Sequence, residues 1–358
     1  MTMKTSIRNL AGMVSGLKKK RKDVFGRIYD IRISEGSLIV PDSMESWIKN
    51  RFGSKKLVEN QSVVKVLNKI TGEESLFNEI RSKRPVQTNE AKGLNSIKVG
   101  RCSFCEPEKN TPEDVFGRIR GRHCITASNV AKYDKWHGLI VFRNHNPFEF
   151  GAEMVSDYID TAMNWFNKVM ENDKNARFPF FMWNCLWRAG ASINHGHAQV
   201  TVAERPYSAL EMLGRCAYNY RKKHSSVYFD DLFLAHESVG LGLRNKKSRL
   251  MAYLTPVKDN EIMILADSVG EDLKKSIYGV LKSLYGKGNR GFNVAVVPFP
   301  IYASKSSGGS KWEGLPVVAR VVDRGNLDKK TSDIGSMELY AGSVISSDPF
   351  NTIRNLKV

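Results

Sequence analysis

The stretch 184–199 holds the densest group of chemically active side chains in the chain. Within it His195, His197 and Gln199 stand two residues apart, and a strand presents side chains with this spacing on one face. Gly196 and the small residues before His195 leave room for a phosphate or a backbone segment to approach closely. An imidazole can attack phosphorus when a hydrogen bond holds its second ring nitrogen. The pattern therefore indicates phosphate chemistry on a histidine, although a surface strand with two chance histidines would share it.

Cys102 and Cys105 form a Cys-x-x-Cys pair, the second feature that can do chemistry. Two thiolates at this spacing chelate one Zn²⁺ from a turn, and two further ligands complete a tetrahedron. The sequence has no second Cys-x-x-Cys, which makes His145 and His195 the candidates for the remaining ligands. A redox pair, which here would lack a thioredoxin-like flank, and two inert thiols are the alternatives.

Composition limits the class of protein. The chain has 358 residues, of which 41% are hydrophobic and 10% aromatic, enough to build a sizeable core. No apolar run approaches the roughly 20 residues that cross a bilayer, and the basic run Lys18–Lys22 follows rather than precedes a short apolar stretch, unlike a secretory signal. Five cysteines favour a reducing, cytoplasmic location. The net charge of +18 attracts polyanions but does not choose between nucleic acid and phosphorylated metabolites.

The elements that must position these residues fall into five segments. We expect a flexible basic tail over 1–22, and an N-terminal extension over 23–99 that contains a strand pair within Arg27–Val40. A catalytic unit over 100–207 and a second unit over 249–358 flank a connecting helix and loop over 208–248. The predicted elements are strands over 138–142, 178–183 and 197–202 with a helix over 153–170 in the first unit, and strands over 250–257, 261–265, 292–297 and 315–322 with a helix over 272–285 in the second. This order suggests strand–strand–helix–strand–strand twice, and predicts a duplicated α+β fold with antiparallel sheets and packed helices.

These features together resemble a known family. The Cys-x-x-Cys pair, the turn that ends at His145 and the block from Asn184 to Gln199 occur in the order found in the His-x-His-x-Gln branch of the histidine-triad superfamily. The sequence is most similar there to the galactose-1-phosphate uridylyltransferase family, although Gly196 replaces the proline between that family's two histidines. The resemblance covers residues 100–205 well and 250–345 weakly, and it implies that the second unit is a degenerate copy of the histidine-triad-like first.

The resemblance assigns a role to each matching residue. His197 would attack the α-phosphorus of a nucleoside diphosphate compound to form a nucleotidyl-histidine, and Gln199 would donate a hydrogen bond to the phosphoryl oxygens. His195 would join Cys102, Cys105 and His145 around a structural zinc ion. Further positions match more weakly: Asn184 and Ser192 would orient the nucleophile and phosphates, Asn129 and Arg188 would contact the substrate, and Glu338 would contact a hexose.

The leading hypothesis is a nucleotidyltransferase that moves a nucleoside monophosphate between a nucleotide sugar and a sugar 1-phosphate. The alternative within enzymes is a phosphorylase of a dinucleoside polyphosphate or a nucleotide sugar. The alternative from another class is a nucleic-acid-binding protein that uses the cysteine pair as a zinc knuckle and the basic charge for contact. The leading hypothesis implies nucleotide sugars and sugar phosphates as partners, with no membrane and no nucleic acid. A homodimer is suggested by the family alone.

Overall fold

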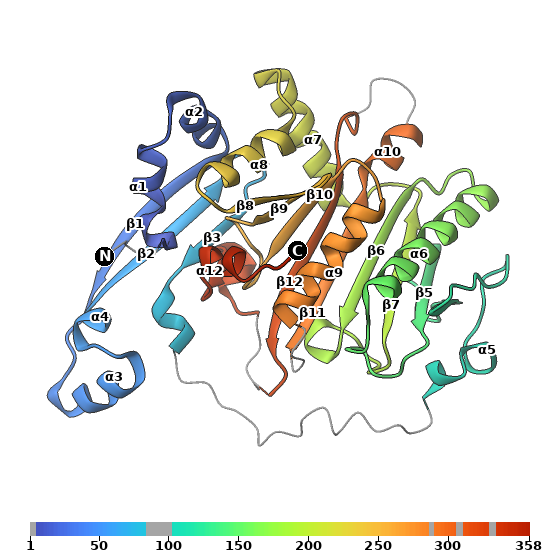
Figure 1. Cartoon of the computed structure of the whole chain (residues 1–358), viewed down its shortest axis with the longest axis horizontal. Coiled ribbons are helices and arrows are strands. Elements are labelled where there is room, and N and C mark those ends of the chain that lie inside the picture. Colours follow the sequence, from blue (N-terminus) through green and yellow to red (C-terminus); the bar gives the residue numbers. More distant parts are fainter. Residues whose placement is uncertain (1–4, 84–101, 286–289, 306–310, 329–333) are drawn as a thin grey trace.

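A computed structural model describes residues 5–83, 102–285, 290–305, 311–328 and 334–358 of the chain. Within these ranges, the centre of the molecule is a nine-stranded antiparallel sheet made of two similar halves (Figure 1). The first half contains β4 (Cys124–Ser128), β5 (Trp136–Phe142), α6 (Ala152–Asn172), β6 (Phe178–Cys185) and β7 (His197–Ala203). The second half contains β9 (Ser248–Ala252), β10 (Ile262–Ala266), α9 (Glu271–Tyr285), β11 (Arg290–Pro298) and β12 (Val317–Asn326), with β8 (Gly242–Asn245) at its edge. The predicted α+β fold with a repeated unit is confirmed.

The two halves meet at the middle of this sheet. The strand order is β4-β5-β7-β6-β11-β12-β10-β9-β8, so β6 of the first half pairs with β11 of the second. In this register Asn184 lies opposite Asn293, and Met182 lies opposite Ala295. The sheet is therefore continuous across the junction, which we call the seam.

Helices α6 and α9 lie side by side on one face of the large sheet (Figure 1). Since side chains alternate along a strand, Ala198 and Val200 of β7 join the core on this face, while His197 and Gln199 point to the other. The approach of α6 is close at β5, where a Cβ on Gly138 would lie 2.8 Å from the Trp165 ring. The helices thus fill one face and leave the opposite face for the site.

A small cluster on that opposite face holds the cysteine pair in place. The short helix η5 (Ser103–Cys105) places Phe104 on β4 and β5, where it packs in a core cluster with Ile125, Ala127, Leu139 and Val141. Val141 lies directly opposite His197 in the pairing of β5 with β7. The cysteines on either side of Phe104 are thereby brought to the start of β7.

The N-terminal region builds a second sheet. Its order is β1 (Tyr29–Ser37), β2 (Asn60–Asn68), β3 (Glu74–Phe77) and β13 (Ser343–Ile345), with β13 parallel to β3. The C-terminal part of the chain thus completes a sheet begun by the N-terminal part. The remaining elements are η1 (Ile7–Asn9), α1 (Leu10–Ser15), α2 (Lys19–Ile28), η2 (Asp42–Met44), α3 (Glu45–Phe52), α4 (Lys55–Glu59), η3 (Glu79–Lys83), α5 (Pro107–Asn110), η6 (Trp187–Ala189), α7 (Ser208–His224), α8 (Tyr228–Ser238), α10 (Phe299–Lys305), α11 (Met337–Tyr340) and α12 (Pro349–Arg354).

Two expectations for the N-terminal region need correction. Residues 5–22 are folded rather than a flexible tail: Leu10 is fully buried, and the backbone N–H of Ile7 donates to Asp348 at 3.1 Å. The basic run opens α2, whose apolar residues Val24, Phe25 and Ile28 are buried, so a helical face anchors the charges. The two strands expected within 27–40 are a single strand, β1. It pairs with β2, which is distant in sequence, and not with a second strand of a hairpin. Residues 84–99 of the expected extension lie outside the described residues.

In the described part of the chain, no helix combines the length and the apolar composition needed to cross a bilayer.

Candidate active site and metal centre

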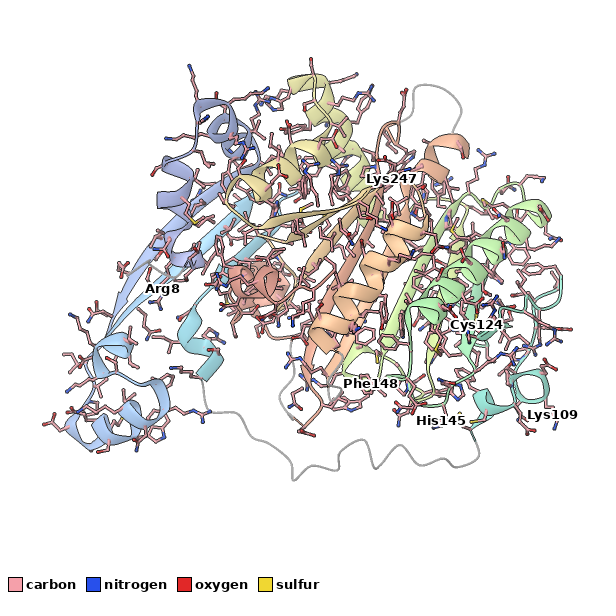
Figure 2. All side chains as sticks on the ribbon, in the orientation of Figure 1. Arg8, Lys109, Cys124, His145, Phe148 and Lys247 are labelled. Atoms are coloured by element: carbon pink, nitrogen blue, oxygen red, sulfur yellow. The ribbon has the colours of Figure 1, made fainter. Side chains whose placement is uncertain are left out.

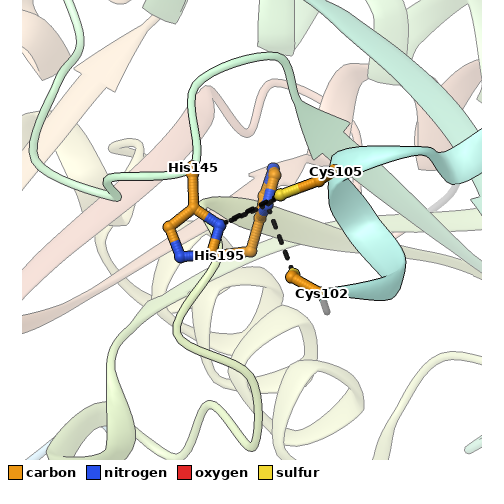
Figure 3. A group of neighbouring side chains, drawn as sticks. All are labelled: Cys102, Cys105, His145 and His195. Atoms are coloured by element: carbon orange, nitrogen blue, oxygen red, sulfur yellow. Dashed lines mark hydrogen bonds between the residues drawn. The ribbon is translucent and has the colours of Figure 1, made fainter. Parts of the chain in front are cut away.

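Four side chains from three separate segments meet in front of β7. Cys105 comes from η5 and Cys102 from the position just before it, while His145 comes from the turn after β5 (Figure 2) and His195 from the loop before β7 (Figure 3). The Nδ1 atom of His195 lies 3.6 Å from each cysteine Sγ and 3.2 Å from Nδ1 of His145. Cys105 Sγ lies 3.2 Å from His145 Nδ1, and all four donor atoms lie within 4.8 Å of one another. The structure thus brings together the four ligands expected for zinc.

The donor geometry fits a tetrahedral ion. Bonds of about 2.0–2.3 Å at tetrahedral angles place ligand atoms about 3.3–3.8 Å apart, close to the contacts observed here. His195 Nε2 lies 2.8 Å from the carbonyl of Phe142, which fixes the proton on Nε2 and turns the lone pair of Nδ1 toward the cluster. Burial, together with the neighbouring His145 and His197, lowers the pKa of His195 despite this hydrogen bond, so the ring is held neutral as a ligand. The four residues fit Zn²⁺.

His197 is buried and oriented through its backbone neighbour. Its Nδ1 lies 2.8 Å from the carbonyl oxygen of His195 and donates to it, so the lone pair of the neutral ring is on Nε2. Nε2 has no hydrogen-bond partner among the described residues. Burial lowers the pKa of His197, although the carbonyl of His195 opposes this effect. The ring of Phe104 meets the imidazole edge-on with centroids 5.2 Å apart. Together, these contacts hold a neutral imidazole in one orientation with Nε2 free.

Gln199 is oriented by a histidine that the sequence analysis missed. The backbone N–H of Tyr133 donates to His137 Nδ1 at 3.0 Å, so the neutral His137 ring carries its proton on Nε2. That Nε2 donates to Gln199 Oε1 at 2.8 Å, and Asn129 Nδ2 lies 3.2 Å from the same nitrogen. With its oxygen engaged, Gln199 has an amide NH₂ that no described residue binds. Side chains alternate along β5, so His137 lies on the same face as Val141, which pairs with His197. This alternation is the signal from which His137 could have been predicted.

Asn184 is held by residues of the second half that the sequence analysis also missed. Asn293 Nδ2 donates to Asn184 Oδ1 at 2.6 Å, and Arg324 donates to Asn293 Oδ1 at 2.8 Å. Arg188 reaches the same place, where its Nε donates to the carbonyl of Arg324 at 3.0 Å. Asn293 is a polar residue within an apolar strand, and this pattern could have identified it as a candidate site residue. No local sequence pattern distinguishes Arg324 in this way.

Two candidate residues stand apart from these contacts. Ser192 is exposed on the loop before β7 and has no side-chain hydrogen bond within the described ranges. Glu338 lies on α11, where its carboxylate pairs with Lys258 at 3.0 Å and accepts the N–H of Gly335 at 2.8 Å. Their predicted contacts with phosphate and hexose remain predictions.

Gly196 explains one departure from the family pattern. A Cβ at this position would lie 2.7 Å from the ring of Phe142 and 3.3 Å from the backbone of Pro147. The N–H of Gly196 also donates to the carbonyl of His145 at 3.2 Å, a bond that proline could not make. A glycine between the two histidines therefore suits the tight packing around the candidate metal ligands in this chain.

The fold defines the class of structure to which the chain is similar: the class that includes an ADP-glucose phosphorylase, a GalT-like protein and a uridylyltransferase. No family model matches the sequence, and no curated protein matches it. Among solved structures, an ADP-glucose phosphorylase from Arabidopsis thaliana with bound ADP-glucose is similar with a TM-score of 0.60, 12% identity, and coverage of 81% of this chain and 96% of that chain. A GalT-like protein from Arabidopsis thaliana is similar with a TM-score of 0.58 and 12% identity over 81% of this chain and 97% of that chain. A uridylyltransferase is similar with a TM-score of 0.54 and 12% identity over 82% and 96%. The fold expected from the family resemblance is confirmed.

Proposed function

We propose that the protein is a nucleotidyltransferase that forms a covalent nucleotidyl intermediate on His197. The observation that carries the proposal is the hydrogen bond from His197 Nδ1 to the carbonyl of His195, which leaves Nε2 as the nucleophilic atom. Gln199, with its oxygen engaged by His137, supplies an N–H donor on the same strand face.

The reaction takes place in two displacements. Nε2 of His197 attacks the α-phosphorus of a nucleoside diphosphate sugar, the bond from that phosphorus to the bridging oxygen breaks, and the sugar 1-phosphate leaves. A phosphate oxygen of the acceptor then attacks the same phosphorus, the P–N bond breaks, and its electron pair returns to Nε2. Donors that face the phosphoryl oxygens stabilise the charge that develops in both steps.

Zinc has a structural place in this proposal. Cys102, Cys105, His145 and His195 would hold the ion, which supplies a fixed crosslink between η5 and the loop before β7. Because the carbonyl of His195 accepts the hydrogen bond from His197 Nδ1, a fixed His195 also fixes the orientation of the nucleophile.

The acceptor distinguishes two versions of the enzyme. The resemblance to galactose-1-phosphate uridylyltransferases favours a hexose 1-phosphate as acceptor of a uridylyl group. The similarity of the fold to an ADP-glucose phosphorylase with bound ADP-glucose supports inorganic phosphate as the second candidate, with release of a nucleoside diphosphate. Both versions use the same nucleotidyl-histidine.

Labelling tests the proposal directly. The protein is incubated with UDP-glucose or ADP-glucose labelled at the α-phosphate, and protein-bound label is measured after gel filtration. We expect label that is stable to alkali and labile to acid, absent from His197→Ala and present in His224→Ala, a matched control on α7. A chase with galactose 1-phosphate, glucose 1-phosphate or inorganic phosphate then identifies the acceptor. Absence of label with every nucleotide sugar, together with tight oligonucleotide binding, would support the nucleic-acid-binding alternative instead.

A further inference from the structure

Two carboxamide side chains lie beside His197, one on each of two neighbouring strands. Met182 of β6 pairs with Gln199 of β7, so Asn184, two residues further along β6, lies level with His197 on the same face. Asn184 and Gln199 share one property: each has its oxygen bound to another side chain, and each has an NH₂ that no described residue binds. Two amide donors are thus left available next to one free imidazole nitrogen.

The orientation of Asn184 is set by a chain of hydrogen bonds that begins in the second half. A guanidinium only donates, so Arg324 requires the oxygen of Asn293 to face it, as it does at 2.8 Å. The NH₂ of Asn293 must then face the opposite way, where it donates to Asn184 Oδ1 at 2.6 Å and to the carbonyl of Ala189 at 2.8 Å. Asn184 must in turn direct its own NH₂ away from Asn293. The permanent charge of one arginine therefore fixes both amides.

Close packing at the seam keeps these groups in register. A Cβ on Gly291 would lie 3.3 Å from Cβ of Arg188, 3.3 Å from the carbonyl of Cys185 and 3.5 Å from Cβ of Arg324. The hydrogen bond from Arg188 to the carbonyl of Arg324 ties the loop after β6 to the end of β12. The first half therefore contacts the second at the point where Asn293 and Arg324 act.

We propose that Asn293 and Arg324 are positioning residues that orient the amide of Asn184 as a donor to the phosphoryl group on His197. This inference rests on the proposed function. It gives the second half, which contains no histidine over 249–358, a part in the chemistry. A donor held in place before the reaction stabilises the charge that develops on the phosphoryl oxygens without reorganisation.

The test measures the single-turnover rate of label transfer to His197 for two Asn293 variants, each in the wild-type and in the Asn184→Ala background. Asn293→Leu keeps the branched shape of the side chain but removes the donor, whereas Asn293→Asp still accepts from Arg324 but can no longer donate to Asn184. We expect each variant to slow labelling by about tenfold to a hundredfold at saturating substrate, with an unchanged thermal midpoint. In the Asn184→Ala background, the same substitutions are expected to cause little further loss, because the residue through which they act is gone.

The outcomes separate this inference from the proposed function. If the wild-type protein takes no label, the proposed function fails. If the wild-type protein is labelled but the Asn293 variants react at the wild-type rate, or lose the same factor with and without Asn184, the positioning role is overturned. Asn172→Asp at the exposed end of α6 controls for the added negative charge, and it is expected to leave the rate unchanged.

Discussion

Each of three imidazoles at the site has one ring nitrogen bonded to a backbone group, and this contact decides what the other nitrogen does. His195 donates from Nε2 to the carbonyl of Phe142 and turns Nδ1 toward the cysteines. His197 donates from Nδ1 to a carbonyl and keeps Nε2 free. His137 accepts a backbone N–H on Nδ1 and donates from Nε2 to Gln199. In the proposed function, one residue type would thereby supply a metal ligand, a nucleophile and a donor that orients Gln199.

The role of His137 leads to a prediction. In His137→Phe the buried ring is kept but Gln199 loses the donor to its oxygen, so its amide can turn and present oxygen to the phosphate. We expect labelling of His197 to slow by about tenfold, the usual effect of one lost hydrogen bond with a charged group. Single-turnover labelling checks this, with His224→Phe as the control for the chemical change. A His137→Phe variant as fast as the wild-type protein would show that Gln199 does not depend on His137.

At the scale of elements, the proposed metal centre is where η5, the turn after β5 and the loop before β7 meet, and a bound ion would crosslink them. Cys105 contacts both histidines, so Cys105→Ala removes the ligand that links them. We expect about one zinc ion per wild-type chain by elemental analysis, loss of most of it in Cys105→Ala, and a lower thermal midpoint. Cys216→Ala, on α7 and outside the cluster, is expected to retain the metal. Equal metal content in both variants would contradict the assignment of the ligands.

The folded N-terminal segment gives a second prediction at this scale. Leu10 opens α1 and is fully buried, whereas Lys20 on α2 is exposed. Leu10→Ala is expected to lower the free energy of unfolding by about 3 kcal/mol, because a buried leucine leaves a cavity. Lys20→Ala is expected to change it by less than about 0.5 kcal/mol. Urea unfolding measures both values, and an unchanged stability of Leu10→Ala would indicate a segment that is not part of the core.

The sequence predicts the elements well where a pattern is local. Apolar residues at helical spacing predict α6 and α9, and apolar runs predict β6, β7 and β11, because each pattern reports the burial of a single element. The ligands Cys102 and Cys105 and the strand histidines are also local patterns. The pairing of β1 with β2 and the contact of Asn293 with Asn184, 109 residues apart, are not local, so no spacing predicts them.

At the scale of the whole molecule, the two halves use equivalent strands differently. By its place in the repeat, β12 corresponds to β7, and where β7 carries His197 and Gln199, β12 carries Arg320. Arg320 forms ion pairs with the buried Glu261 and with Glu73, which adjoins β3 of the N-terminal sheet. Through Arg320 the second half thus holds the N-terminal sheet on this face, whereas the corresponding strand of the first half carries the residues of the proposed site.

His236 links the same parts of the molecule and makes their association sensitive to acid. Its ring lies between Tyr29 of β1 and Tyr253 after β9, with centroids 5.6 and 5.7 Å away. Burial lowers the pKa of His236 to about 4, although the carbonyl of Leu232 opposes this effect. The unfolded chain, in which this pKa is about 6.5, therefore binds one more proton between these values. The stability that the neutral His236 ring contributes is therefore fully present above about pH 6.5, and it is lost as the pH falls toward 4.

This titration predicts a measurable loss of stability. From His236 alone, the free energy of unfolding is expected to be about 2 kcal/mol lower at pH 5 than at pH 7. Urea unfolding at the two pH values measures the difference. In His236→Gln the difference in the free energy of unfolding between pH 7 and pH 5 is expected to be smaller by this amount. Because each protein is compared with itself at the two pH values, the destabilisation that the substitution causes at pH 7 cancels. A His236→Gln variant with the pH dependence of the wild-type protein would show that the buried ring does not stay neutral as the structure requires.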